Sequence, residues 1–102
     1  MSRTPSYALE EIQRAIGNGT YAITLSAAED AASLLLDERD VRDCILMLEP
    51  RHFYKSMQAN KRPGYSQDVY RCRYRDTAIY TKVQMGAGGR AVVISFKRDE
   101  SA

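Results

Sequence analysis

The stretch QDVYRCRYRDTAIYTKVQMGAGGRAVVISFK, residues 67–97, decides the fold, because its side chains alternate between apolar and polar over three successive runs. An alternation with a period of two is typical of β-strands that bury one face. A turn at Asp76-Thr77 and a glycine-rich loop at 86–89 are short enough to join the runs into an antiparallel meander. The predicted strands are residues 67–74, 78–85 and 90–97. In the last two strands, Ile79, Thr81, Val83 and Met85 are predicted to share one face, and so are Val92, Ile94 and Phe96.

The first half of the chain shows helical spacing instead of alternation. We expect a first helix to begin at Thr4-Pro5, because proline suits the first helical position. Gly17-Asn18-Gly19 should end this helix, since glycine readily adopts the left-handed conformation of a helix C-cap. Residues 21–25 alternate and predict a short extended segment.

Two further helices are expected before the strands. Ser26 and Glu29 form a capping-box pair, which predicts an alanine-rich helix running to Leu36. Apolar residues at helical spacing after Asp40 predict the next helix. The remaining segments are predicted to be a helical turn over 50–57, a loop over 58–66 and a polar, frayed tail over 98–102. Helices followed by a strand meander indicate an α+β fold.

Size and composition exclude several classes of protein. The chain has 102 residues, 44% of them hydrophobic, which suits one domain over residues 1–102. No run approaches the ~20 apolar residues of a membrane helix, and the N-terminus does not read as a secretory signal, so we expect a cytoplasmic protein with no membrane contact. Cys44, Cys72 and His52 are one ligand short of a closed zinc site, so we expect free thiols and no metal or cofactor.

The net charge of +2 hides an asymmetry between the two halves of the chain. Residues 1–50 carry 4 basic and 9 acidic side chains, whereas residues 51–102 carry 11 basic and 4 acidic ones and seven of the nine aromatics. Basic side chains neutralise phosphates and aromatic rings stack on unpaired bases, so nucleic acid is the first candidate partner. An acidic protein surface is the second candidate, and a solvated basic sheet face without a partner is the simpler reading.

The arginines of the first predicted strand and the last hairpin suggest where a site could form. Arg71, Arg73 and Arg75 alternate with apolar residues, which predicts that all three lie on one face. If Met85 pairs with Val92, Tyr80 falls opposite Lys97 on the polar face of the hairpin. An ordinary cross-strand cation–aromatic pair would look the same, so spacing alone does not establish a site.

A cluster of Lys, Arg and Tyr could cleave RNA without a metal. RNA carries its own nucleophile, the 2′-hydroxyl, so an enzyme needs only to align it, move two protons and stabilise the charged phosphate. With one histidine in the chain, a histidine pair is excluded. A lysine of lowered pKa can accept a proton, and a tyrosine can donate or accept one.

Four motifs now resemble one family. They are FYKSM at 53–57, QDVYR at 67–71, IYTK at 79–82 and VISFK at 93–97. Together with Arg3-Thr4-Pro5 they are similar to the MqsR family, the toxins of bacterial type II toxin–antitoxin pairs. The resemblance implies a RelE-like fold, with N-terminal helices packed on a small antiparallel sheet formed by the C-terminal half. It also implies a ribosome-independent mRNA endoribonuclease that inhibits translation, and a cognate DNA-binding, MqsA-like antitoxin.

The resemblance also assigns the catalytic residues. The family's active-site positions match Lys55, Gln67, Tyr80 and Lys97. The residues that we assign to substrate binding are Arg71, Arg73, Tyr70 and Lys82. Tyr65-Ser66 and Cys72 depart from the family pattern beside the expected RNA groove, so base preference could differ. The alternative is a non-catalytic RNA- or protein-binding module on the same fold.

Overall fold

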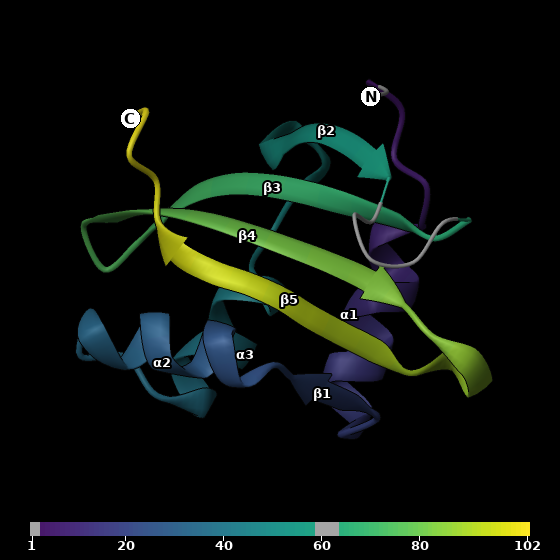
Figure 1. The fold of residues 1–102 in the computed structure, drawn as a ribbon, viewed down its shortest axis with the longest axis horizontal. Coiled ribbons are helices and arrows are strands. Elements are labelled where there is room, and N and C mark those ends of the chain that lie inside the picture. The colour runs from purple at the N-terminus through teal and green to yellow at the C-terminus, as the bar shows by residue number, and fades with distance from the viewer. Residues whose placement is uncertain (1–2, 59–63) are drawn as a thin grey trace.

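The computed structural model describes residues 3–58 and 64–102 (Figure 1). The helices are α1 (Leu9–Asn18), α2 (Leu25–Ser33) and α3 (Glu38–Leu46), with short 3-10 helices at Pro50–His52 and Ala87–Gly89. The strands are β1 (Tyr21–Ile23), β2 (Phe53–Gln58), β3 (Ser66–Tyr74), β4 (Thr77–Met85) and β5 (Ala91–Arg98). They form one sheet in the order β1-β5-β4-β3-β2, in which only the β1–β5 pair is parallel. The α+β prediction is confirmed.

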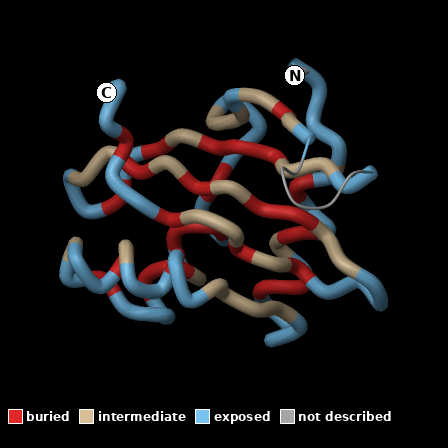
Figure 2. The backbone as a smooth tube through the Cα atoms, viewed as in Figure 1, coloured by how far each residue is buried: buried red, intermediate tan, exposed pale blue. Residues whose placement is uncertain are grey.

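The helices gather on one side of the sheet and enclose the core (Figure 1). Ile12 and Ile16 of α1 and Ile45 of α3 are fully buried in one cluster with Ile79 and Phe96 of the sheet. Figure 2 shows buried residues along the middle strands and on the helix sides that face them, while loops and turns are exposed. Among the described residues, none of the helices is long and apolar enough to cross a membrane. In the part of the chain that the structure describes, no helix lies on the opposite face of the sheet (Figure 1).

The first helix begins at Leu9, so the predicted start at Thr4-Pro5 is wrong. The carboxylate of Asp68, fully buried in β3, accepts hydrogen bonds from the backbone N–H groups of Ser6 and Tyr7 at 2.9–3.0 Å. Ala8, which is extended at φ −67° and ψ 128°, is the N-cap of α1, so the helix begins only after it, and the two amides tie the preceding segment to β3. The predicted end is confirmed, with Gly19 in the left-handed conformation at a φ of 79°.

The other two helices are capped by different residues from those expected. Thr24, not Ser26, caps α2: its hydroxyl accepts from the Ala27 N–H at 3.1 Å. The α3 helix begins at Glu38, two residues before Asp40. Asp37 and Asp40 cap it reciprocally, each carboxylate accepting the backbone N–H of the other.

The predicted helical turn over 50–57 is helical only to His52 and then becomes β2. The pairing of β2 with β3 shifts between Phe53 and Lys55, which leaves Tyr54 as an extra residue in a bulge. This bulge interrupts the alternation on which strand prediction depends, which is why sequence spacing missed the strand. The predicted loop over 58–66 lies partly outside the described residues.

The last hairpin pairs Tyr80 with Lys97, as predicted, but not from the predicted starting pair. Met85 lies opposite Ala91 rather than Val92, and a shift between Lys82 and Val83 restores the expected register further along. This shift leaves Ile94 as an extra residue in β5, so the alternation of buried and exposed side chains changes phase there. The core-facing residues are therefore Ala91, Val93 and Phe96, and the prediction that Val92, Ile94 and Phe96 share one face is wrong.

The turn between β3 and β4 is formed by Arg75 and Asp76, one residue earlier than predicted, with φ values of 49° and 64°. This conformation turns Arg75 away from the line of the β3 arginines. Its guanidinium pairs with Asp40 on α3 at 3.0 Å. The prediction that three arginines share one face therefore holds for Arg71 and Arg73 only.

A cationic face on the open side of the sheet

The face of the sheet without helices, called here the open face, carries side chains in rows set by the strand register. One row consists of Arg71, Tyr80 and Lys97. The next row, about 6.6 Å along the strands, consists of Lys55, Val69, Lys82 and Ser95. Beyond it, Gln67 on β3 donates a hydrogen bond to Gln84 on β4 at 3.1 Å. All four residues assigned to catalysis from the sequence therefore share one surface.

The phenol and the ammonium of the first row are close together. Lys97 Nζ lies 5.3 Å from the centroid of the Tyr80 ring. Burial, with Tyr54 and Asp99 nearby, raises the pKa of Tyr80, and the Arg71 charge opposes this only in part. The Tyr80 phenol therefore holds its proton at neutral pH and is available as a donor.

Tyr54, which the sequence analysis did not single out, joins the two rows. The bulge aims its ring onto the open face, where the guanidinium carbon of Arg71 lies 4.8 Å and Lys55 Nζ lies 5.3 Å from the ring centroid. Both contacts fall within cation–π range. Its position directly before the motif lysine was the available signal, but without the bulge an alternating strand would point Tyr54 to the opposite side.

Arg71 is held in place by the C-terminal tail. Its Nε donates to Asp99 Oδ2 at 2.6 Å, and its Nη2 donates to the Ser101 hydroxyl at 2.8 Å. Burial acts to raise the pKa of Asp99, but hydrogen bonds from Ser101 and Arg71 lower it, and the lowering prevails. The expectation of a frayed tail is wrong at Asp99, which is 6% exposed and donates its own N–H to Ala78 on β4.

The lysines on the open face have no carboxylate partners among the described residues. Lys82 lies at the centre, and burial together with the charges of Lys97 and Lys55 lowers its pKa. Three like charges therefore face one surface, and the Asp99 carboxylate is already engaged by Arg71. Such an arrangement costs folding free energy and attracts an anion.

One of the residues assigned to substrate binding, Tyr70, lies on the other side of the sheet. Tyr70 points to the helix side, is 1% exposed and packs edge-on against Phe53 with ring centroids 5.7 Å apart, so it is a core residue. Burial raises its pKa to about 12. Arg73 stays on the open face and donates to the carbonyl oxygen of Asp76 at 2.9 Å.

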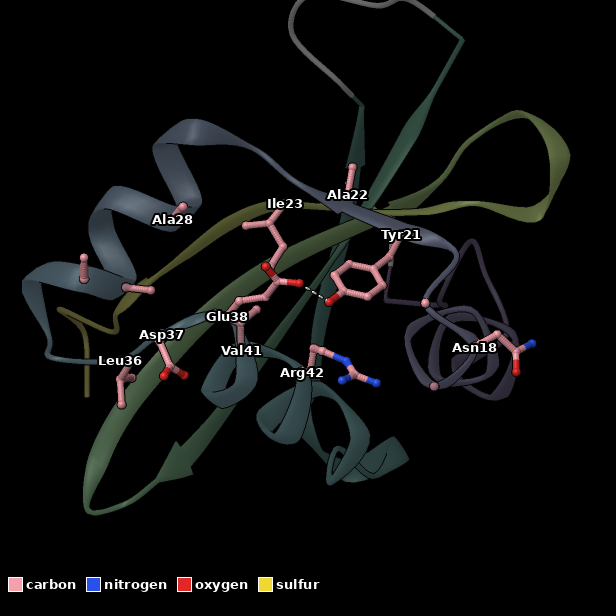
Figure 3. Close-up of a pocket in the computed structure, with 14 residues that line it drawn as sticks. Asn18, Tyr21, Ala22, Ile23, Ala28, Leu36, Asp37, Glu38, Val41 and Arg42 are labelled. Atoms are coloured by element: carbon pink, nitrogen blue, oxygen red, sulfur yellow. Dashed lines mark hydrogen bonds between the residues drawn. The ribbon is translucent and has the colours of Figure 1, made fainter.

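A hollow of about 860 Å³ lies on the helix side, between β1, the end of α1, α2 and α3 (Figure 3). In it the Tyr21 hydroxyl donates to the Glu38 carboxylate, and the Arg42 guanidinium carbon lies 5.8 Å from the Tyr21 ring centroid. None of the residues predicted for the site lines this hollow. The open face, where those residues meet, is the better candidate site.

The fold and the open face together define a small α+β protein with a cationic, tyrosine-containing surface suited to a polyanion. A family model described as "Motility quorum-sensing regulator, toxin of MqsA" matches residues 4–98. The "mRNA interferase toxin MqsR" of Escherichia coli (strain K12) is 32% identical over 95 residues, which are 93% of this chain and 95% of that relative. The chain belongs to the MqsR toxin family.

Proposed function

We propose that this toxin is an endoribonuclease that cuts single-stranded mRNA and so inhibits translation. The observation that carries the proposal is the group of unpaired lysines around Tyr80, with Arg71 fixed beside it. A surface of this kind binds phosphates, and it also supplies groups that can donate and accept protons. The printed name of the Escherichia coli relative, an mRNA interferase toxin, supports the same activity.

The proposed reaction uses the 2′-hydroxyl of the RNA as nucleophile and needs no metal ion. Its oxygen loses a proton and attacks the adjacent phosphorus, while the bond from phosphorus to the 5′-oxygen breaks and that oxygen takes up a proton. The products are a cyclic phosphate and a 5′-hydroxyl end. The protein must therefore neutralise the phosphate and provide one proton acceptor and one donor.

We assign these tasks to the first two rows. Lys97 and Arg71 neutralise the phosphate, because they flank Tyr80 in one row. The raised pKa of Tyr80 suits it to protonate the leaving 5′-oxygen. Lys55 acts as the base or as a second cation.

The remaining polar residues of the open face hold the RNA. Gln67, whose amide is fixed by Gln84, orients the nucleotide. Lys82 and Arg73 contact the flanking backbone, since they lie on the same face one row to either side of Tyr80. We further propose that a cognate antitoxin silences the toxin and that the toxin acts in the cytoplasm.

The experiment is incubation of the purified protein with an unstructured RNA in excess chelator, followed by mapping of the new 5′ ends. The wild type should cut at a limited set of sites. Lys97→Ala should lose about 10²-fold or more in rate, and Tyr80→Phe should also lose activity. RNA that stays intact but binds in a salt-sensitive manner would instead favour the non-catalytic binding module.

A further inference from the structure

A second hollow, of about 810 Å³, adjoins the first row of the open face. It lies at the edge of β3 beyond the start of β2, between the Pro50–His52 turn and the C-terminal tail. Its lining includes His52, Tyr54, Arg71, Arg73, Ala78 and Asp99. Arg71 thus belongs both to the proposed phosphate site and to the wall of this hollow.

Arg73 and Ala78 continue the rows of the open face into the hollow. They are paired across β3 and β4, about 6.6 Å beyond the pair formed by Arg71 and Tyr80. The small side chain of Ala78 leaves space where a larger residue would fill the row. The guanidinium of Arg73 is anchored by the Asp76 carbonyl and has no carboxylate partner among the described residues, so it can bind a phosphate.

Tyr54 and Arg71 supply a flat surface beside this cation. The Tyr54 ring is 47% exposed, and the guanidinium carbon of Arg71 lies 4.8 Å from its centroid. Since Asp99 and Ser101 fix Arg71, the contact between Tyr54 and Arg71 is already formed before a ligand binds. Aromatic rings and guanidinium planes are the groups on which unpaired bases stack.

His52 adds a hydrogen-bonding group to the lining. Its Nδ1 accepts the backbone N–H of Glu49 at 2.9 Å, and burial together with the Arg51 charge lowers its pKa. The neutral ring therefore carries its proton on Nε2, which leaves one donor for an acceptor on a ligand.

We propose that this hollow is a nucleotide subsite, which holds the base and the flanking phosphate of the nucleotide next to the bond that is cut. The base stacks on the Tyr54–Arg71 surface, and Arg73 binds the phosphate. The proposal rests on the proposed function, because it deepens the same RNA site. It predicts that the protein distinguishes a neighbouring nucleotide on one side of the cut from one on the other.

The test uses short synthetic RNAs built around a bond identified by end mapping. A dinucleotide across that bond is compared with two trinucleotides, extended by one residue on the 5′ or the 3′ side. One trinucleotide should be cut about tenfold faster, by kcat/KM, than the dinucleotide. Tyr54→Leu and Arg73→Gln should each reduce this advantage to about twofold or less, whereas Arg90→Gln, on the exposed β4–β5 loop, should retain it.

Binding of the fully 2′-deoxy versions, measured by fluorescence anisotropy, gives a second readout that does not require cleavage. Wild type that cuts RNA but gains from neither extension, or variants that keep the full gain, would overturn the subsite and leave the nuclease intact. A protein that cuts no RNA would refute the proposed function, and the anisotropy series would still decide the subsite. Tighter binding of a hexaglutamate peptide than of a 2′-deoxy hexanucleotide would assign the hollow to an acidic protein instead.

Discussion

Replacing Lys82 with methionine should stabilise the fold and weaken the activity at the same time. Lys82 lies over fully buried Val69 in the middle of the open face, and methionine can cover the same surface with a side chain of similar length. What the substitution removes is a partly buried ammonium among like charges. The native state should therefore gain free energy, while RNA loses a contact.

The size of the gain follows from the strand register. Lys97 lies two residues beyond Ser95, the partner of Lys82, which places it at a diagonal cross-strand position about 7–8 Å away. Lys55 is two strands away, at roughly 9.6 Å. At 8 Å two unit charges repel by about 0.5 kcal/mol in water and about 2 kcal/mol at an effective dielectric constant of 20. After screening by salt, a total of about 1 kcal/mol is expected, which corresponds to a Tm higher by about 4–8 °C.

The pH dependence of this gain has a definite sign. The native pKa of Lys82 lies below its ordinary value of 10.5, so the unfolded chain binds this proton more tightly. Below the native pKa both states are protonated and the destabilisation is fully present. As the pH rises through the native pKa toward 10.5, Lys82 loses its charge in the native state before it does in the unfolded chain. The stability difference between wild type and Lys82→Met therefore disappears. Thermal melts from neutral to alkaline pH, with Arg90→Met as control, measure the difference.

Activity provides the other half of the test. Lys82→Met should lower kcat/KM on RNA at least about tenfold, and the loss of one phosphate contact should reduce the slope of log K against log salt by about 0.7. A variant that melts below wild type would show that the three lysines do not repel each other as the register implies. A variant that melts higher but cuts and binds RNA normally would remove Lys82 from the substrate-binding residues.

Three other substitutions or probes test separate parts of the structure. Asp99→Asn should release Arg71, which raises KM for RNA and lowers cleavage while Tm changes little, and Asp99→Glu should restore part of the lost activity. Equal kinetics for wild type and both variants would argue against a positioning role for Asp99. Asp68→Ala should cost about 1–3 kcal/mol of unfolding free energy in urea titrations, because it leaves two partly buried N–H groups of the N-terminal segment without their acceptor; a loss below the effect of an ordinary surface substitution would contradict this. Cys44, whose sulfur lies 3.5 Å from that of Cys72, should resist iodoacetamide until the protein unfolds, since the hydrogen bond to Cys72 and burial raise the pKa of the Cys44 thiol; rapid labelling of Cys44 in the native protein would refute this.

The sequence was sufficient for the parts of the fold that repeat a regular period. The three strands of the meander and the glycine end of α1 follow from alternation or from a residue with one clear conformational role, whereas Tyr80 lies opposite Lys97 because the shift between Lys82 and Val83 offsets the wrong starting pair. The cap of α2 and the start of α1 did not follow, because they depend on contacts with distant strands. Asp68, for example, holds residues more than 60 positions away in the chain.

The charged residues of the candidate site could be predicted from the sequence, but the residues that hold them in position could not. Lys55 and Lys97 could be placed by motif, and the structure brings them to one face. Asp99 could not be recognised, since a carboxylate in a polar tail resembles a solvated one until its backbone N–H is seen bonded to β4. Tyr70 was misplaced because an aromatic residue in a basic strand suggests base stacking, whereas strand alternation put it among the core side chains.

Both irregularities of the sheet that separate prediction from observation occur beside the site. From the observed pairing of Met85 with Ala91, an unbroken ladder would bring Phe96 opposite Tyr80 and turn Lys97 into the core. The shift between Lys82 and Val83 prevents this, so that Phe96 is buried and Lys97 reaches the open face. The bulge at Tyr54 likewise turns an aromatic ring toward Arg71. Each bulge gives up regular ladder bonding to aim one side chain at the cationic surface, as bulges beside functional sites do. The same sheet therefore buries the core on one side and carries the cationic surface proposed to bind phosphate on the other.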